Sequence, residues 1–240
     1  MTNDALFRRA AGLWEELAAV PAAFPAPGAA TVVVSPASGL CPPGWSGLLT
    51  LNGAVLATVP DERRAGLLRA ALRSCPEAAW NAGLLRTALP VGRILGPAAL
   101  AYLAPEALAP AATGPRPAVH RLPADHPALL ALLARSPAED RDEASLDEIT
   151  SPAFTVLRHG RALAACGYRA WPHRTAQFAV LTAPEARGRG LARTAATAAA
   201  AHALSAGLLP QWRARVPASR RVAARIGFRE LGAQLSAEIP

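Results

Sequence analysis

In the first half of the chain, the apolar positions predict one helix followed by short strands. Residues 3–19 carry apolar side chains along one helical face. Short apolar runs predict three strands, at residues 31–34, 47–51 and 54–59. Asn52 and Gly53 separate the last two runs, and this pair is typical of a hairpin turn in which both central residues need positive φ. A second helix is expected after Pro60, where acidic residues precede basic ones.

The second half alternates strand-like and helix-like runs. Strands are expected at residues 118–122, 154–160, 161–171, 175–182 and 211–216, and helices at residues 126–135, 142–149, 190–206 and 219–228. The last of these helices is expected to stop at Gly227. The run "RELGAQLSAEI" predicts a final strand or hairpin. This alternation predicts the α/β class with a mixed sheet.

A segment rich in Pro, Ala and Gly, residues 106–120, marks the expected boundary between two domains. We expect an N-terminal α/β lobe over residues 1–110 and a second domain over residues 116–240. The order strand, strand, helix in the first half leaves two interpretations open. The lobe is either a degenerate copy of the second domain or a smaller lobe that shapes a substrate site.

Composition sets broad limits on the class of protein. The 240 residues are 52% hydrophobic, and no stretch approaches the ~20 apolar residues of a membrane span. The first residues lack a signal-peptide core, which indicates a cytoplasmic protein without membrane partners. Three distant cysteines indicate neither a disulfide framework nor a metal site.

The net charge of +8 does not by itself indicate a nucleic-acid partner. All 25 basic residues are Arg, none is Lys, and they are spread along the chain, as a GC-rich coding sequence would produce. This distribution disfavours nucleic-acid binding by charge alone. It still favours an anionic ligand or partner.

The turn "RGRGLA" (187–192) between an expected strand and an expected helix has the features of a phosphate site. The first N–H groups of a helix lack intrahelical partners and lie at the positive end of its dipole. Glycines let an anion approach the backbone closely. The spacing is neither that of a P-loop nor that of a dinucleotide-binding fold. It fits the pattern R-x-x-G-x-[G/A], with Arg187, Gly190 and Ala192.

The stretch "VLTAPEARGRGLA", together with "PASRRVAARIGFRELG" further on, resembles the GNAT acyltransferase superfamily over about residues 116–240. The resemblance implies a mixed, mostly antiparallel sheet flanked by helices. It also implies acetyl-CoA or another acyl-CoA as donor and no metal. The residues it assigns to coenzyme A are Val180, Leu181, Thr182, Arg187, Gly188, Arg189, Gly190, Leu191, Ala192, Arg193 and Ser219.

The resemblance implies direct attack of an amine on the thioester, without a covalent enzyme intermediate. A backbone N–H near Val180 is expected to stabilise the oxyanion. Glu143 and Glu148, in the acidic run "DEASLDEI", are the candidates for a general base, although a solvated helix face explains either one singly. His173 is a weaker candidate. Ser219 is also expected to be a helix N-cap.

The sequence departs from the family pattern at two positions. Val216 stands where the family usually has an Asn that contacts coenzyme A, and Ala223 stands where a Tyr often protonates the leaving thiolate. A thiol of pKa ~8.5 can leave with solvent as the acid. Tyr168, Trp171 and Trp212 are expected to fill the core rather than line a pocket.

These residues leave three functions open. The first is an N-acetyltransferase acting on a primary amine. The second uses an acidic acyl carrier protein or an aminoacyl-tRNA as donor, as some bacterial biosynthetic enzymes do. The third is a non-catalytic coenzyme A-binding scaffold, which the changes at Val216 and Ala223 would explain. The acceptor and the oligomeric state, monomer or homodimer, are left open.

Overall fold

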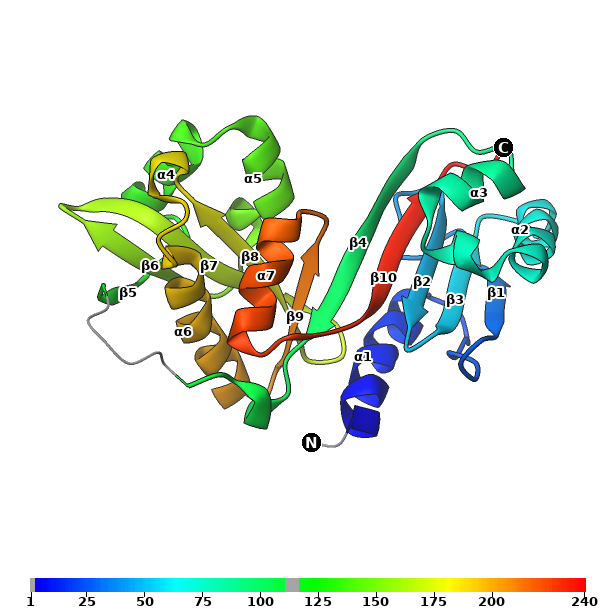
Figure 1. Ribbon diagram of the computed structural model, residues 1–240, viewed down its shortest axis with the longest axis horizontal. Coiled ribbons are helices and arrows are strands. Elements are labelled where there is room, and N and C mark those ends of the chain that lie inside the picture. The colour runs from blue at the N-terminus through cyan, green and yellow to red at the C-terminus, as the bar shows by residue number, and fades with distance from the viewer. Residues whose placement is uncertain (1–2, 111–116) are drawn as a thin grey trace. The chain divides into compact units, whose positions relative to one another are not determined.

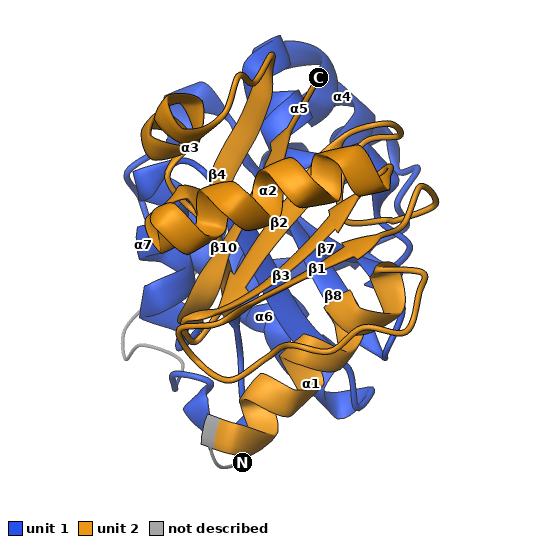
Figure 2. Ribbon diagram, turned by 90° about the vertical axis from the view of Figure 1, so that its right-hand side faces the viewer, with its two compact units in different colours: residues 1, 102–229 blue, residues 2–101, 230–240 orange. Residues whose placement is uncertain are grey.

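The computed structural model describes residues 3–110 and 117–240 and divides the chain into two compact units (Figures 1 and 2). The N-terminal unit comprises residues up to 101 together with residues 230–240, and the C-terminal unit comprises residues 102–229. Of the segment predicted to separate two domains, residues 111–116 lie outside the described residues. The predicted boundary itself stays a prediction.

The N-terminal unit contains five strands and four helical segments among its described residues. In chain order they are α1 (Asn3–Leu17), β1 (Ala30–Val34), β2 (Ser46–Leu51), β3 (Ala54–Val59), α2 (Glu62–Ser74), η1 (Pro76–Ala79), α3 (Ala82–Ala88), β4 (Ile94–Tyr102) and β10 (Arg229–Ala237). The strand order is β1-β3-β2-β10-β4, with β1 parallel to β3 and β2 antiparallel to both β3 and β10. The last strand of the chain therefore lies inside the sheet of the N-terminal unit.

Local sequence signals explain most of this unit. Asn52 and Gly53 adopt φ of 48° and 79° and close the β2–β3 hairpin, as predicted. Helix α2 lies across the sheet in Figure 2 and buries Leu68 and Leu72 in a core that includes Val55 of β3. These apolar positions recur at helical spacing, so one face of α2 covers the sheet.

The sheet strands of the C-terminal unit follow the order β9-β8-β7-β6-β5. Its elements are η2 (Pro105–Ala107), β5 (Val119–Leu122), α4 (Pro127–Arg135), α5 (Ala138–Ala144), η3 (Leu146–Glu148), β6 (Ala153–Arg158), β7 (Arg161–Trp171), β8 (Thr175–Thr182), η4 (Pro184–Ala186), α6 (Leu191–Ser205), β9 (Leu209–Ala214) and α7 (Pro217–Ile226). All neighbouring strands are antiparallel except β8 and β9, which are parallel. The predicted mixed, mostly antiparallel sheet flanked by helices is confirmed.

Different helices cover the two faces of this sheet. Helices α4 and α5 with η3 pack on one face through an apolar core that includes Leu132, Leu146 and Leu181. Helix α6 packs against β6, β7 and β8 and buries five alanines, Ala195, Ala196, Ala199, Ala200 and Ala203. Alanine has no side chain beyond Cβ, so this face of α6 can approach the sheet closely.

Aromatic residues fill the space beneath α6. Phe178 of β8 stacks on Tyr168 and on Trp212, with ring centroids 6.0 Å apart in both pairs. Tyr168 and Trp212 are 6% and 4% exposed, so the expectation that they fill the core is confirmed. Tyr168 Oη also forms a 2.9 Å hydrogen bond with His202 Nδ1 of α6.

The environment of His202 predicts a pH dependence of stability. Burial, and then the nearby positive charge of Arg121, lower the pKa of His202 below its ordinary value of 6.5. The unfolded chain therefore binds the proton more readily, so stability rises with pH. We expect His202 to contribute fully above about pH 7 and to lose its contribution as the pH falls through 6.5 towards the lowered pKa.

Thermal unfolding between pH 5 and pH 8 measures this contribution. His202→Gln should flatten the pH profile, whereas His120→Gln, on an exposed part of β5, should leave it unchanged. An identical slope in wild type and His202→Gln would show that another group is responsible.

Candidate coenzyme A site

The loop between β8 and α6 has the geometry of an open anion site. Gly188 and Gly190 adopt φ of +75° and +74°, a conformation that L side chains rarely adopt. A Cβ atom at either position would meet nothing within 4 Å. The two glycines are thus required by the backbone conformation, and open space lies beside them.

The N-terminus of α6 also leaves its amides without partners. Gly190 is its N-cap and provides no side-chain cap. Within residues 3–110 and 117–240, no hydrogen bond engages the amides of residues 188–193. Helix α2 offers a contrast, because the Asp61 carboxylate caps it by accepting from Arg64 N at 2.9 Å. Of these two N-termini, that of α6 is the one open to an anion.

The arginines of the loop differ in how they are held. Arg187 forms an ion pair with Asp140 of α5, and Arg189 donates to the Glu185 carbonyl oxygen at 3.0 Å. Both residues are exposed. Arg193 lies in the first turn of α6 and is partly exposed. The loop therefore adds positive charge to the positive end of a helix dipole.

Strand β8 has an edge that β9 leaves open. The parallel pairing of β8 with β9 extends from Thr175 to Gln177 and stops there. Ala183 N donates to the oxygen of Leu163, which lies directly opposite on β7. Hydrogen-bonded pairs alternate along an antiparallel ladder, so Leu181 bonds to β7, and Val180 and Thr182 turn their amides and carbonyls towards the open edge.

The two candidate bases lie on different elements, which corrects the expectation of one helix over residues 142–149. Helix α5 ends at Ala144, and Ser145 adopts a left-handed conformation with φ of 46°. Glu143 thus belongs to α5, and Glu148 belongs to the short helix η3. The sequence around Ser145 contains no Gly or Pro that signals this break.

Both carboxylates are paired with arginines. Glu143 accepts from Arg215, just after β9, through both oxygens, with Oε2 2.7 Å from Nε and Oε1 3.2 Å from the backbone N. Glu148 accepts from Arg169 through Oε2 at 2.7 Å. The structure thus brings each candidate base beside a guanidinium of the same unit.

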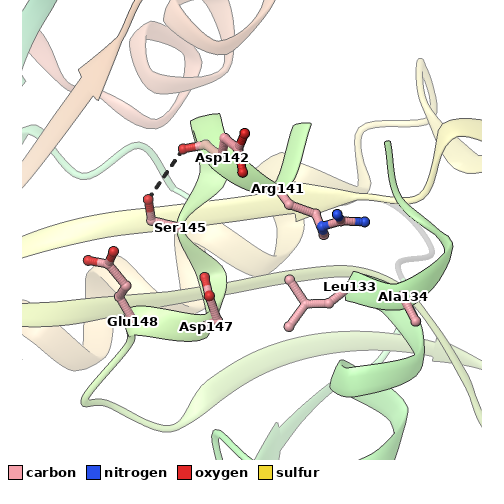
Figure 3. Close-up of a pocket in the computed structure, with 7 residues that line it drawn as sticks. All are labelled: Leu133, Ala134, Arg141, Asp142, Ser145, Asp147 and Glu148. Atoms are coloured by element: carbon pink, nitrogen blue, oxygen red, sulfur yellow. Dashed lines mark hydrogen bonds between the residues drawn. The ribbon is translucent and has the colours of Figure 1, made fainter. Parts of the chain in front are cut away.

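A hollow of about 530 Å³ lies between α4 and the α5–η3 segment (Figure 3). Its lining residues are Leu133, Ala134, Arg141, Asp142, Ser145, Asp147 and Glu148. Glu148 is the one of the two candidate bases that lines it, and no residue of the turn 187–193 does. The hollow is therefore distinct from the loop that the sequence assigns to coenzyme A.

The expectation that Ser219 caps a helix is wrong. Helix α7 begins at Pro217 with Val216 as its N-cap, and the Ser219 hydroxyl accepts from Trp212 Nε1 at 2.9 Å. Ser219 therefore fixes the Trp212 ring within the C-terminal unit. Ala223 is buried in α7 and supplies no proton donor where the family often has Tyr.

Two residues in the centre of this region were missed by the sequence analysis. Gln177 and Gln211 are Cα partners at the last paired position of β8 and β9. Each interrupts an apolar strand run, in "TAQFAV" and "LPQWRA", and this interruption is the signal that could have found them. Arg215, which holds Glu143, was also missed.

Comparison with known proteins identifies the family of this region. Residues 152–233 match the model of the GNAT acetyltransferase family, so the chain contains a GNAT acetyltransferase domain. The match extends from β6 through β9 and includes α6 and the loop between β8 and α6. It confirms the resemblance found in the sequence. No curated protein matches the chain significantly.

Two solved structures are similar to part of this chain. A GNAT-family protein from Novosphingobium aromaticivorans is 24% identical, with 61% of this chain and 65% of that chain covered and a TM-score of 0.48. A GCN5-related N-acetyltransferase from Kribbella flavida is 17% identical, with 66% and 63% covered and a TM-score of 0.48. The chain thus spans less than two thirds of the length of these two proteins.

Among the described residues, no helix is both long and apolar enough to cross a membrane. In the same part of the chain, no three metal-ligating side chains of His, Cys, Asp or Glu come together.

Proposed function

We propose that the protein is an N-acyltransferase that moves an acyl group, most simply acetyl, from a coenzyme A thioester to a primary amine. The observation that carries the proposal is the juxtaposition of the uncapped N-terminus of α6 with the open edge of β8. Both lie inside the GNAT acetyltransferase domain. Isothermal calorimetry with acetyl-CoA on the wild type and on Gly190→Glu tests the proposal.

The coenzyme A pyrophosphate would bind the amides of residues 188–193. Six amides without partners and the positive end of the α6 dipole favour a dianionic group there. The Arg187 and Arg189 side chains are close enough in sequence to add charge-assisted hydrogen bonds. Ser219 has a weaker claim to coenzyme A, since Trp212 already uses its hydroxyl oxygen.

The pantetheine arm would extend along β8 as an added strand. The polar backbone groups of Val180 and Thr182 face the open edge, and Leu181 between them anchors the strand to β7. The Val180 N–H would then donate to the thioester carbonyl oxygen. Such a contact stabilises the tetrahedral oxyanion by about 3 kcal/mol.

The reaction needs no covalent enzyme intermediate. The amine nitrogen attacks the thioester carbon, the C–N bond forms, the C–S bond breaks, and the nitrogen loses one proton. The thiolate that leaves takes a proton from solvent, since a thiol of pKa ~8.5 is a good leaving group near neutrality. Cys166 does not act as a nucleophile in this scheme, because it is completely buried, and burial raises its pKa well above the ordinary value.

Glu148 is the better of the two candidate bases. Glu143 engages both oxygens with Arg215, whereas Glu148 engages Oε2 with Arg169 and has Oε1 left for a proton. We expect Glu148→Gln to lower kcat about a hundredfold, the lower end of the range for a general base. We expect Glu143→Gln to change kcat by less than about tenfold.

Steady-state kinetics over pH 6 to 9, with the best acceptor from an amine panel, measures both variants. Circular dichroism checks that each one is folded. Equal losses in the two variants would contradict the assignment of Glu148 as the base.

A further inference from the structure

The pairing of β8 with β9 ends at two glutamines on one face of the sheet. Gln177 and Gln211 are Cα partners in a parallel pair, so their side chains point to the same face. This face also carries Ala179 and Leu181 of β8, which pack in the core beneath α4 and α5. Gln177 and Gln211 form the last of the three pairs between β8 and β9, so the two residues stand next to the open edge described above.

Both glutamines have a buried amide oxygen without a hydrogen bond. Gln211 is 0% exposed, and its Nε2 is 3.3 Å from Tyr102 Oη. Its Oε1 is buried and has no partner among the described residues, and the same holds for Oε1 of Gln177. Buried polar atoms are almost always hydrogen-bonded, and two such exceptions on neighbouring strands call for an explanation.

The arginine opposite Gln177 is already paired. Arg169 is the Cα partner of Gln177 on β7, and its guanidinium donates to Glu148. Two neutral oxygens are therefore left, each with lone pairs that can accept hydrogen bonds. The ligand that satisfies them must present N–H or O–H donors.

We propose that Gln177 and Gln211 bind the acceptor amine, an inference that rests on the acyltransferase function proposed above. An amine presents two or three N–H donors from one atom, which suits two oxygens on adjacent strands. The Val180 N–H, on the same open edge, would hold the thioester close by. Neutral amide oxygens orient the nitrogen without the negative charge with which a carboxylate would stabilise its protonated form. The two glutamines are positioning residues and take no proton.

Ethylamine is the probe for this site, and tetramethylammonium is the matched cation without N–H donors. The side-chain amide signals of Gln177 and Gln211, assigned in NMR spectra from Gln177→Leu and Gln211→Leu, are followed during titration of the CoA-saturated protein. We expect ethylamine to shift both signals saturably and tetramethylammonium to shift neither. Each Leu variant should weaken ethylamine binding about threefold to tenfold, the equivalent of one hydrogen bond.

Two further measurements separate this role from a structural one. Gln211→Leu should lower the melting temperature by less than Gln234→Leu, since its Oε1 has no partner among the described residues and its Nε2 makes only a long 3.3 Å hydrogen bond to Tyr102 Oη. Gln234→Leu is the control, because Gln234 is also buried but donates to the Leu40 oxygen at 2.6 Å. That variant should lower the melting temperature and leave ethylamine binding unchanged.

The outcomes distinguish this inference from the proposed function. Ethylamine that causes no saturable shift, or that acts like tetramethylammonium, overturns the glutamine site even if coenzyme A binds. A melting temperature that falls as much in Gln211→Leu as in Gln234→Leu, with amine binding intact, also overturns it. A wild-type protein that does not bind coenzyme A refutes the proposed function. In that case the ethylamine titration, carried out without CoA, still tests the two glutamines.

Discussion

Gly190→Glu is expected to weaken coenzyme A binding at least about a hundredfold while leaving the protein folded. The new side chain would place a carboxylate in the open space beside the amides of residues 188–193, where the pyrophosphate is expected. Repulsion between the two anions adds to the loss of charge-assisted hydrogen bonds. Isothermal calorimetry with acetyl-CoA, longer acyl-CoAs and free CoA measures the change.

Gly160→Glu is a close control for this experiment. Gly160, in the β6–β7 turn, has φ of +75°, and its Cβ would also meet nothing within 4 Å. The two variants thus share the backbone strain and the added charge but differ in their place in the fold. Equal affinity losses in both would refute the loop as the coenzyme A site. A wild type that binds none of the ligands would favour a carrier protein or an aminoacyl-tRNA as donor.

Gly227→Ala is expected to destabilise the protein by about 3 kcal/mol or more. Gly227 ends helix α7 with φ of +110°, and a Cβ there would lie 1.9 Å from the carbonyl oxygen of Ala107. The carbonyl oxygen of Ala107 belongs to the backbone, and two residues further on the Ala109 N–H donates to Ile226 O at 2.8 Å. This segment therefore cannot rotate away as a side chain could. Urea unfolding followed by circular dichroism measures the loss.

Gly160→Ala separates the two causes of that loss. This variant also places alanine at a positive φ, but the new Cβ meets no neighbour within 4 Å. We expect it to cost about 1 kcal/mol, the strain of a non-glycine residue in the left-handed region. A Gly227→Ala variant no less stable than Gly160→Ala would show that the chain near Ala107 moves freely.

The features that the sequence predicted well are those encoded locally. The Asn52-Gly53 hairpin, the helix end at Gly227 and the RGRGLA turn each depend on a few adjacent residues whose backbone needs are specific. Their type and place follow from the residues themselves. The same is true of β8, whose bounds the apolar run predicts.

The features that escaped prediction depend on distant neighbours. The chain breaks at Ser145, which is neither Gly nor Pro, between α5 and η3 that both pack on the sheet. Ser219 looks like a helix cap, but its hydroxyl lies beside Trp212. Gln211 is brought beside Gln177 only because β9 pairs with β8. Nothing in the run LPQWRA indicates which strand it pairs with. The experiments above therefore test the roles proposed for the residues of the candidate coenzyme A site.

The place of β10 has a consequence for how the chain folds during synthesis. Thr50 of β2 and Ala233 of β10 exchange hydrogen bonds across 183 residues of sequence, and the whole C-terminal unit lies between them along the chain. The C-terminal unit is continuous and can form as it leaves the ribosome, whereas the sheet that begins first is completed last. Until then β2 presents an unpaired edge in the nascent chain, which is the period in which this protein is most exposed to aggregation.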